Sequence, residues 1–370
     1  MKMSLSGSDA SAHLHGGNAL PLFEKYGVSP REVLDFSVSV NPLGPPEAIV
    51  EIWPRLIEYL PQYPTVNGDG IRHYYSQAYS ISKESILAGN GSVELMYRCF
   101  SALPIRRIGV VCPSFFDYAQ ALRAANVTCD FVSLSHLNGF LAPPVSVLQD
   151  VLRRNDGVII GNPNNPTGTR YDRDTLVALA KEHPSKYIFV DEAFLPFCEN
   201  ESSQTLLSRS TLASNLIIFR SLTKMFAIPG LRAGALVSTE QTVQSFRQLA
   251  APWVNNVVID HIAPLLLNCT GYISATRQFV RKEMYRLKAG LANLSGVSWF
   301  GGNINFALLR LMPPLCLDDV MRQLLGNGLL VRDCRNFHGF DGEFLRFCVR
   351  TPSDNSALLS ALQQIASAAK

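Results

Sequence analysis

Short apolar runs alternate with amphipathic stretches between residues 82 and 238 of the chain. The apolar runs are rich in β-branched residues and are mostly flanked by turn residues, which is typical of buried strands. They are RIGVVC, CDFVSL, GVIIGN, KYIFVDEA, NLIIFRS and GALVS. Stretches such as FDYAQALRAAN and DRDTLVALAKEH lie between them and have the periodicity of amphipathic helices. Because strands and helices alternate, the pattern predicts an α/β layer fold with a mostly parallel sheet.

The pattern changes near Gly271. A long charged helix in SATRQFVRKEMYRLKAGLANL leads to shorter strands in VSWFGGNINFALLRL, GLLVRDC and EFLRFCVR, and a final helix closes the chain. This order predicts a smaller α+β domain at the C-terminus. The first 48 residues are rich in loops and hold one strand candidate, VLDFSVSVN. Their pattern leaves open whether they pack on the smaller domain.

Composition narrows the functional classes. Of the 370 residues, 47% are hydrophobic, so the chain can bury a large core. Only 17% are charged, and the net charge of +3 comes without a long run of one sign, which argues against a nucleic-acid-binding stripe or a polybasic membrane patch. The eight cysteines show neither C-x-x-C nor zinc-ligand spacing, so we expect reduced thiols and no metal site. The N-terminus lacks an apolar leader segment, which predicts a cytoplasmic location.

The residues that follow each strand are informative, because ligands of parallel sheets bind at the carboxyl ends of the strands. Asp191 follows KYIFV, Asn165 lies in NPNNPTG after GVIIG, and Lys224 follows NLIIF in the stretch RSLTK. The carboxylate of Asp191 should be partly desolvated and stays ionised only if a cation meets it. Taken singly, NPNNPTG is a rigid loop, and Asp191 is a helix cap or half of an internal ion pair.

Weaker signals lie at other strand ends. In GNGSVELMY, Gly91 allows a tight turn and Ser92 opens a helix, whose backbone N–H groups can bind an anion. G-x-G-S is also a common turn without a ligand. Phe115 and Phe116 follow another strand, where a flat ligand can stack on one of them, although aromatic residues at such places more often belong to the core.

Together these residues match the requirements of pyridoxal phosphate. The amine of Lys224 can join the cofactor's aldehyde, and Asp191 can pair with the pyridinium nitrogen so that the ring accepts electrons. Asn165 can donate a hydrogen bond to the ring 3-oxygen, and Phe115 can stack on the ring. The candidate groups for the phosphate are the turn of Gly91 and Ser92, the hydroxyls of Ser221 and Thr223, and the guanidinium of Arg232.

At these residues the chain resembles the fold-type I, aspartate-aminotransferase-like enzymes. The stretches NPNNPTG, DEAF, SLTKMFAIPGLRAG and LRFCVR carry the resemblance in order and spacing. It implies a large domain with a seven-stranded, mostly parallel sheet at 49–270, and a smaller domain at 271–370 on which the segment 1–48 packs. It also implies that Lys224 is the Schiff-base lysine, that Asp191 is the partner of the pyridine nitrogen, and that Arg346 holds a substrate carboxylate.

A closer resemblance is to the threonine-phosphate decarboxylase branch of this family, which acts in cobalamin biosynthesis. HLHGGNA, SPREVLDFSVSVNPLGPP, AAPWVNN and RDCRNFHGF are the stretches that carry it. In this branch the HGGN stretch lies near the substrate phosphate and two late arginines hold the substrate's anionic groups. The residues implied here are His15, Gly16, Gly17, Asn165, Arg332 and Arg346.

The same branch implies a homodimer in which Tyr63 reaches a phosphate across the interface. Two departures from the family pattern matter. Phe194 stands where many aminotransferases carry a tyrosine that binds the ring 3-oxygen, which leaves Asn165 as the side-chain donor. The GNGSVE loop differs from the acid-rich loop expected in the branch, so the role of Ser92 rests on its place at a helix start alone.

The resemblance implies decarboxylation of O-phospho-L-threonine, or of O-phospho-L-serine, to the amino-alcohol phosphate of the cobamide nucleotide-loop linker. The sequence does not choose between these substrates, which differ by one methyl group. A histidinol-phosphate aminotransferase is the first alternative, because it shares the lysine, the aspartate and a phosphorylated substrate. A regulatory module that binds pyridoxal phosphate is the second, although no basic helix-turn-helix segment accompanies it.

Overall fold

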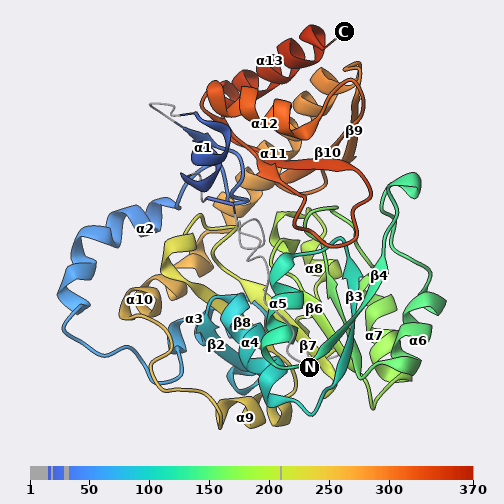
Figure 1. The fold of residues 1–370 in the computed structure, drawn as a ribbon. Coiled ribbons are helices and arrows are strands. Elements are labelled where there is room, and N and C mark those ends of the chain that lie inside the picture. Colours follow the sequence, from blue (N-terminus) through green and yellow to red (C-terminus); the bar gives the residue numbers. More distant parts are fainter. Residues whose placement is uncertain (1–15, 18–19, 29–32, 209–210, 370) are drawn as a thin grey trace, which may run out of the picture.

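The computed structural model describes residues 16–17, 20–28, 33–208 and 211–369. They form a large α/β unit and a smaller unit that sits above it in Figure 1. Within the described residues, the large sheet has seven strands in the order β2-β8-β7-β6-β5-β3-β4. The strands are β2 (Ile86–Asn90), β3 (Arg107–Cys112), β4 (Thr128–Ser133), β5 (Gly157–Gly161), β6 (Tyr187–Asp191), β7 (Leu216–Ser221) and β8 (Ala233–Val237).

This sheet confirms the predicted α/β fold. All six apolar runs form strands, and β3 to β7 pair in parallel, whereas β8 runs antiparallel to both of its neighbours. In β6, Ile188 and Val190 belong to the core on one face of the sheet and Phe189 to the core on the other face. Because successive strand residues point to opposite faces, a run that is apolar throughout fits a sheet that is covered on both sides.

Helices cover both faces of the sheet. Apolar residues of α4 (Ser92–Ala102), α5 (Phe116–Ala124) and α9 (Glu240–Arg247) form the core on one face. The core on the other face includes residues of α3 (Asp69–Tyr79), α6 (Val145–Arg154), α7 (Arg173–Glu182) and α10 (Val257–Leu265). The remaining helical elements of this unit are α2 (Glu47–Ile52), η2 (Trp53–Tyr59), η3 (Lys83–Ser85), η4 (His136–Asn138), η5 (Leu195–Phe197), α8 (Glu201–Gln204), η6 (Pro229–Leu231) and η7 (Leu266–Asn268).

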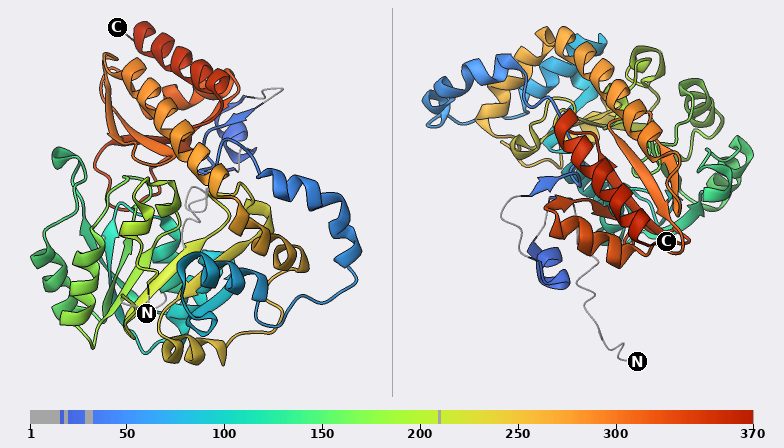
Figure 2. Two further views of the ribbon diagram at one scale, coloured as in Figure 1. Left: turned by 180° about the vertical axis from the view of Figure 1, so that it is seen from behind. Right: turned by 90° about the horizontal axis from the view of Figure 1, so that it is seen from above.

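The smaller unit is built on an antiparallel sheet of order β12-β13-β10-β9. Its strands are β9 (Val297–Gly301), β10 (Phe306–Leu311), β12 (Arg332–Asp333) and β13 (Glu343–Cys348). The helices α11 (Thr270–Leu291), α12 (Leu317–Gly326) and α13 (Pro352–Ala368) pack against it. Figure 2 shows α11 extending from the large unit into the smaller one. We propose the start of α11, near residue 270, as the boundary between the two domains.

The described part of the N-terminal segment packs on the smaller unit. Strand β1 (Leu34–Asp35) pairs in parallel with β11 (Leu329–Leu330), and Phe36 is completely buried in the core of the smaller unit. Helix α1 (Leu20–Tyr26) lies beside the same unit in Figure 1. The strand expected in VLDFSVSVN is shorter than predicted. After Asp35, the backbone N–H and the hydroxyl of Ser37 both donate to the carboxylate of Asp35, at 2.7 and 2.6 Å, and this local turn competes with strand pairing.

No single helix among the described residues is long and apolar enough to span a membrane.

Candidate active site

A cavity of about 400 Å³ lies at the carboxyl ends of β5, β6 and β7, between the large sheet and the smaller unit. Most of the residues singled out in the sequence line it. These are Gly16, Gly91, Ser92, Phe115, Asn165, Asp191, Ser221, Thr223, Lys224, Arg232, Arg332 and Arg346. Gly17 does not line the cavity and instead donates its N–H to the Ser37 hydroxyl at 2.8 Å. His15 lies outside the described residues.

Asp191 ends β6 with its carboxylate buried at the cavity wall. The carboxylate accepts hydrogen bonds from the Tyr118 hydroxyl at 2.8 Å and from the Ala193 N–H at 3.0 Å. Burial raises the pKa of Asp191, whereas these two bonds and the nearby charge of Lys224 act in the opposite direction. The carboxylate of Asp191 is therefore a hydrogen-bond acceptor in a fixed position, and a cationic partner would stabilise its ionised form.

Lys224 follows β7 and reaches into the same cavity. Burial, together with the positive charges of Arg346 and Arg232, lowers the pKa of Lys224 to about 8. A charged amine is destabilised where water is excluded and other cations are near, so the neutral form is populated at mildly alkaline pH. The neutral amine is the form that attacks an aldehyde.

Five residues form a group that we call the phosphate cradle: Gly91, Ser92, Ser221, Thr223 and Arg232. The hydroxyls of Ser221 and Thr223 lie 2.7 Å apart, and Ser92 begins α4, whose first N–H groups lack helical partners. Gly91 has a φ of +90°, and a Cβ there would lie 2.4 Å from Nη2 of Arg232. Gly234 lets β8 approach α4, since its Cβ would lie 2.3 Å from the Ser92 nitrogen. The donor set fits a phosphate dianion.

Two buried arginines face this cavity from the smaller unit. Nη1 of Arg346 donates to Oδ1 of Asn165 at 2.5 Å, and its Nη2 donates to the Ser37 carbonyl at 2.6 Å. Nη2 of Arg332 donates to Oδ1 of Asn336 at 2.7 Å, and burial lowers the pKa of Arg332 to about 10. Neither guanidinium forms an ion pair with a carboxylate in the described part of the chain.

The backbone places these two arginines on one face of one sheet. Arg332 and Arg346 are direct partners across the antiparallel pair β12–β13. Like charges directly opposite each other destabilise a sheet. Aromatic rings stabilise each guanidinium, with Arg346 5.1 Å from the Phe306 ring centroid and Arg332 5.1 Å from that of Phe337. The arrangement places two positive charges close together, and an anionic ligand can neutralise them.

Asn165 retains a free donor for a ligand. Its Oδ1 accepts from Arg346, and no hydrogen bond from its Nδ2 occurs among the described residues. This arrangement is consistent with the predicted donation to a ring oxygen. Phe115 and Phe194 line the cavity, and the rings of Phe194 and Phe306 meet edge to face at 5.0 Å. Phe194 has no hydroxyl, so it contributes packing only.

Sequence reasoning missed several residues of the site. Tyr118, which holds Asp191, is the most important of them, because it touches the group expected to meet the cofactor nitrogen. Its place three residues after Phe115, one turn into α5, is the signal that could have found it. Ser37, Val38 and Ser39 also line the cavity, and their contribution follows only from the packing of the N-terminal segment.

Tyr63 lies away from the cavity of its own chain. Its side chain is 80% exposed, and its ring packs at a tilt against that of Trp253, with 4.9 Å between the ring centroids. A contribution of Tyr63 to a phosphate site therefore requires a second copy of the chain.

Known proteins resemble this chain over most of its length. The family described as aminotransferase class I and II matches residues 31–362. The threonine-phosphate decarboxylase of Salmonella typhimurium is 30% identical over 354 residues, which cover 95% of this chain and 96% of that protein. The adenosylcobalamin biosynthesis bifunctional protein CobDQ of Leptospira interrogans is also 30% identical over 95% of this chain, which spans only 41% of that longer protein.

A solved structure extends the comparison to the fold. The histidinol-phosphate aminotransferase from Clostridium acetobutylicum superposes with a TM-score of 0.84 at 27% identity. The match covers 91% of this chain and 100% of the other.

Replacing Tyr118 tests the support of Asp191. Tyr118→Phe keeps the ring and removes the hydrogen bond, so the pKa of Asp191 should rise further, and affinity for pyridoxal phosphate should fall about tenfold. The titration can be followed by NMR of carboxyl-labelled aspartate in the cofactor-free protein. Tyr171→Phe is the matched control, because the Tyr171 hydroxyl is buried and has no partner among the described residues. An Asp191 titration identical in Tyr118→Phe and in the unmodified protein would contradict the assignment.

Proposed function

The chain belongs to the aminotransferase class I and II family, and from this premise we propose that it is a pyridoxal-phosphate-dependent decarboxylase of a phosphorylated hydroxy amino acid. The substrate we propose is O-phospho-L-threonine, or its close relative O-phospho-L-serine. The product is the corresponding amino-alcohol phosphate, as used for the linker of the cobamide nucleotide loop. Two of the relatives at 30% identity, one named a threonine-phosphate decarboxylase and one an adenosylcobalamin biosynthesis bifunctional protein, support this choice.

The observation that carries the proposal is the pair of buried guanidiniums of Arg332 and Arg346. Burying a charge without a counter-ion costs free energy, and neither arginine forms an ion pair with a carboxylate of the described residues. Asp117 lines the same cavity and acts on Arg332 from beyond ion-pair distance. A substrate with a carboxylate and a phosphate brings an anion for each of them. Planar guanidiniums hold carboxylate and phosphate through paired hydrogen bonds, so they also fix how the substrate is turned.

We propose these roles for the residues of the site. Lys224 would join the cofactor's aldehyde, and Asp191 would pair with its ring nitrogen. Asn165 would donate a hydrogen bond to the ring oxygen, and Phe115 would stack on the ring. The phosphate cradle would bind the phosphate. The cofactor supplies an electron sink for whichever bond at the substrate α-carbon stands perpendicular to its ring. Arg346 holds the substrate carboxylate and Arg332 its phosphate, which together turn the carboxylate bond into that direction. Nζ of Lys224, freed as an amine once the substrate amine takes its place at the aldehyde, would supply the proton that replaces the lost carboxylate at the α-carbon.

Histidinol-phosphate aminotransferase remains the second candidate, and the similarity to the solved Clostridium acetobutylicum structure favours it. It would use the same lysine, aspartate and phosphate-binding arginine. Histidinol phosphate itself has no carboxylate, however, so it would neutralise only one of the two arginines at a time. Phosphothreonine neutralises both in one molecule.

The assay that separates the two candidates omits any oxo acid. With O-phospho-L-threonine or O-phospho-L-serine alone, the holoenzyme should release carbon dioxide. Arg332→Gln should lower kcat/KM by about two to three orders of magnitude, because it removes one partner of a buried charge pair. Arg335→Gln is the control, since Arg335 lies three residues away and pairs with Asp318 and Asp333 outside the cavity. No carbon dioxide, with turnover of histidinol phosphate plus 2-oxoglutarate, would overturn the choice.

We further propose that the enzyme is a homodimer in which Tyr63 reaches the phosphate of the other copy's cofactor. Most of the large apolar side chains exposed in the described residues fall within 43–66 and 249–253. Exposed apolar surface of this kind marks interaction sites. They are Leu43, Val50, Trp53, Ile57, Leu60, Tyr63, Val66, Leu249 and Trp253.

Negative charges introduced into this apolar surface should prevent the two copies from associating. The double variant Ile57→Glu/Leu60→Glu replaces side chains that are 70% and 61% exposed, so each chain should still fold, while sedimentation should show a monomer. Leu137→Glu, at a position 86% exposed outside this surface, should leave the dimer intact. A double variant that sediments as a dimer would remove the basis for a contribution from Tyr63.

A further inference from the structure

The short segment 253–256, which we call the bracing segment, contacts the backbone next to two parts of the phosphate cradle, the turn of Gly91 and Ser92 and the residue Arg232. Nδ2 of Asn255 donates to the Gly89 carbonyl at 2.8 Å, in a buried bond. Gly89 lies in β2, two residues before Gly91. Nδ2 of Asn256 donates at 3.0 Å to the carbonyl of Leu231, the residue before Arg232. Asn255 thus holds the backbone near Gly91, and Asn256 holds the backbone next to Arg232.

Backbone strain occurs on both sides of this contact. Arg232 has a φ of +54° and Trp253 a φ of +57°. Large side chains rarely adopt this left-handed conformation, and it persists only where surrounding contacts fix it. The hydrogen bond from Asn256 to the peptide before Arg232 is one such contact. Strain of this kind gathers at binding sites, because it sets the direction of a functional side chain.

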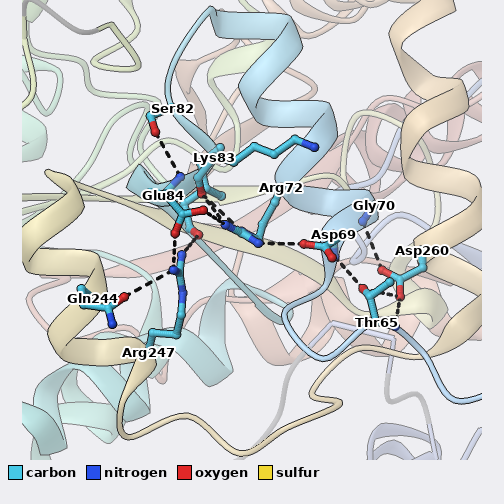
Figure 3. A network of polar contacts seen from close by, with 11 residues as sticks. Thr65, Asp69, Gly70, Arg72, Ser82, Lys83, Glu84, Gln244, Arg247 and Asp260 are labelled. Carbon is cyan, nitrogen blue, oxygen red and sulfur yellow. Dashed lines mark hydrogen bonds and ion pairs between the residues drawn. The ribbon is translucent and has the colours of Figure 1, made fainter.

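The helix that follows the bracing segment belongs to a network of polar contacts, drawn in Figure 3, which we call the base. Helix α10 begins directly after it, and Asp260 in that helix accepts from the N–H and the hydroxyl of Thr65, at 2.7 and 2.8 Å. Asp260 also accepts from the N–H of Gly70 at 3.2 Å, near the start of α3. The base therefore ties α10 to α3 and to the loop before it.

The same base reaches the start of β2. Arg72 of α3 pairs with Asp69 and with Glu84, both at 2.7 Å. Glu84 lies in η3, immediately before β2, and also pairs with Arg247 of α9 (Figure 3). Strand β2 is thus held at its start by Glu84 and at its end by Asn255.

From these contacts we propose that Asn255 and Asn256 are positioning residues that fix the distance between the α4 start and Arg232, and so set the affinity for the cofactor phosphate. The proposal rests on the proposed cofactor. Neither asparagine lines the cavity, so both act through the backbone that they hold. The bracing segment also touches the loop of Tyr63, because the Trp253 N–H donates to the Val66 carbonyl at 3.3 Å.

The test compares binding of pyridoxal 5′-phosphate with binding of pyridoxal, which lacks the phosphate. Asn256→Asp keeps the oxygen that accepts from the Ile259 N–H and caps α10, but it replaces the donor to Leu231 with an oxygen. The dissociation constant of the cofactor-free protein for pyridoxal 5′-phosphate should rise about three- to tenfold. That for pyridoxal should stay unchanged. Asn255→Ala should show the same selective loss, and a larger one, because its bond is buried.

Asn327→Asp is the matched control. Nδ2 of Asn327 also donates to a backbone carbonyl at a helix end, that of Gln323 at 3.0 Å, but it lies in the smaller unit and outside the cavity. It should change neither dissociation constant. If Asn255→Ala fails to fold, Asn256→Asp decides alone.

The outcomes separate this proposal from the proposed function. Equal losses for pyridoxal 5′-phosphate and pyridoxal, or no loss for either, would overturn the positioning role while leaving the cofactor assignment in place. An unmodified protein that binds both compounds equally weakly would overturn the phosphate cradle and the proposed function with it.

Discussion

An excess of positive charge at one buried cavity is the constraint on which the rest of the structure depends. Four cations, Lys224, Arg232, Arg332 and Arg346, line a space that holds only two carboxylates among the described residues, Asp117 and Asp191. Buried charges need counter-ions, and among the described residues no carboxylate lies within ion-pair distance of the two arginines, Arg332 and Arg346, which have neutral hydrogen-bond partners instead. The parallel sheet brings the lysine and aspartate to one edge, and the antiparallel sheet adds the arginines from above. The parallel sheet and the antiparallel sheet thus build one cavity with an excess of positive charge.

Charged residues also lie at the same strand ends on the side of the sheet that faces away from the cavity. Glu192 follows Asp191, and Arg220 precedes Ser221, so both point away from the cavity. Arg220 forms ion pairs with two carboxylates, with Glu192 at 2.9 Å and with Glu201 at 2.7 Å. The charges on this side are therefore neutralised within the chain, whereas Asp191 on the cavity side has hydrogen bonds but no ion pair among the described residues. The contrast supports a functional reason for the unpaired arginines.

Much of this could be predicted from the sequence, because parallel strands bring successive strand ends together without any knowledge of side-chain packing. The placement of Asn165, Asp191 and Lys224 at one cavity follows from that rule. Contacts set by tertiary packing could not be predicted in the same way. The opposition of Arg332 and Arg346 depends on the register of a two-residue strand, and the bond from Asn255 to Gly89 spans 166 residues. Local propensity carries no information about such pairings.

The pKa of Lys224 in the cofactor-free protein tests the central claim most directly. Competitive labelling of lysines across a pH series, analysed by mass spectrometry, reports the amine of each lysine separately. Burial together with the excess of positive charge predicts half-maximal reactivity of Lys224 near pH 8, and a higher value after Arg346→Met removes a neighbouring cation. A midpoint at the ordinary value of 10.5, unchanged by that substitution, would contradict the account.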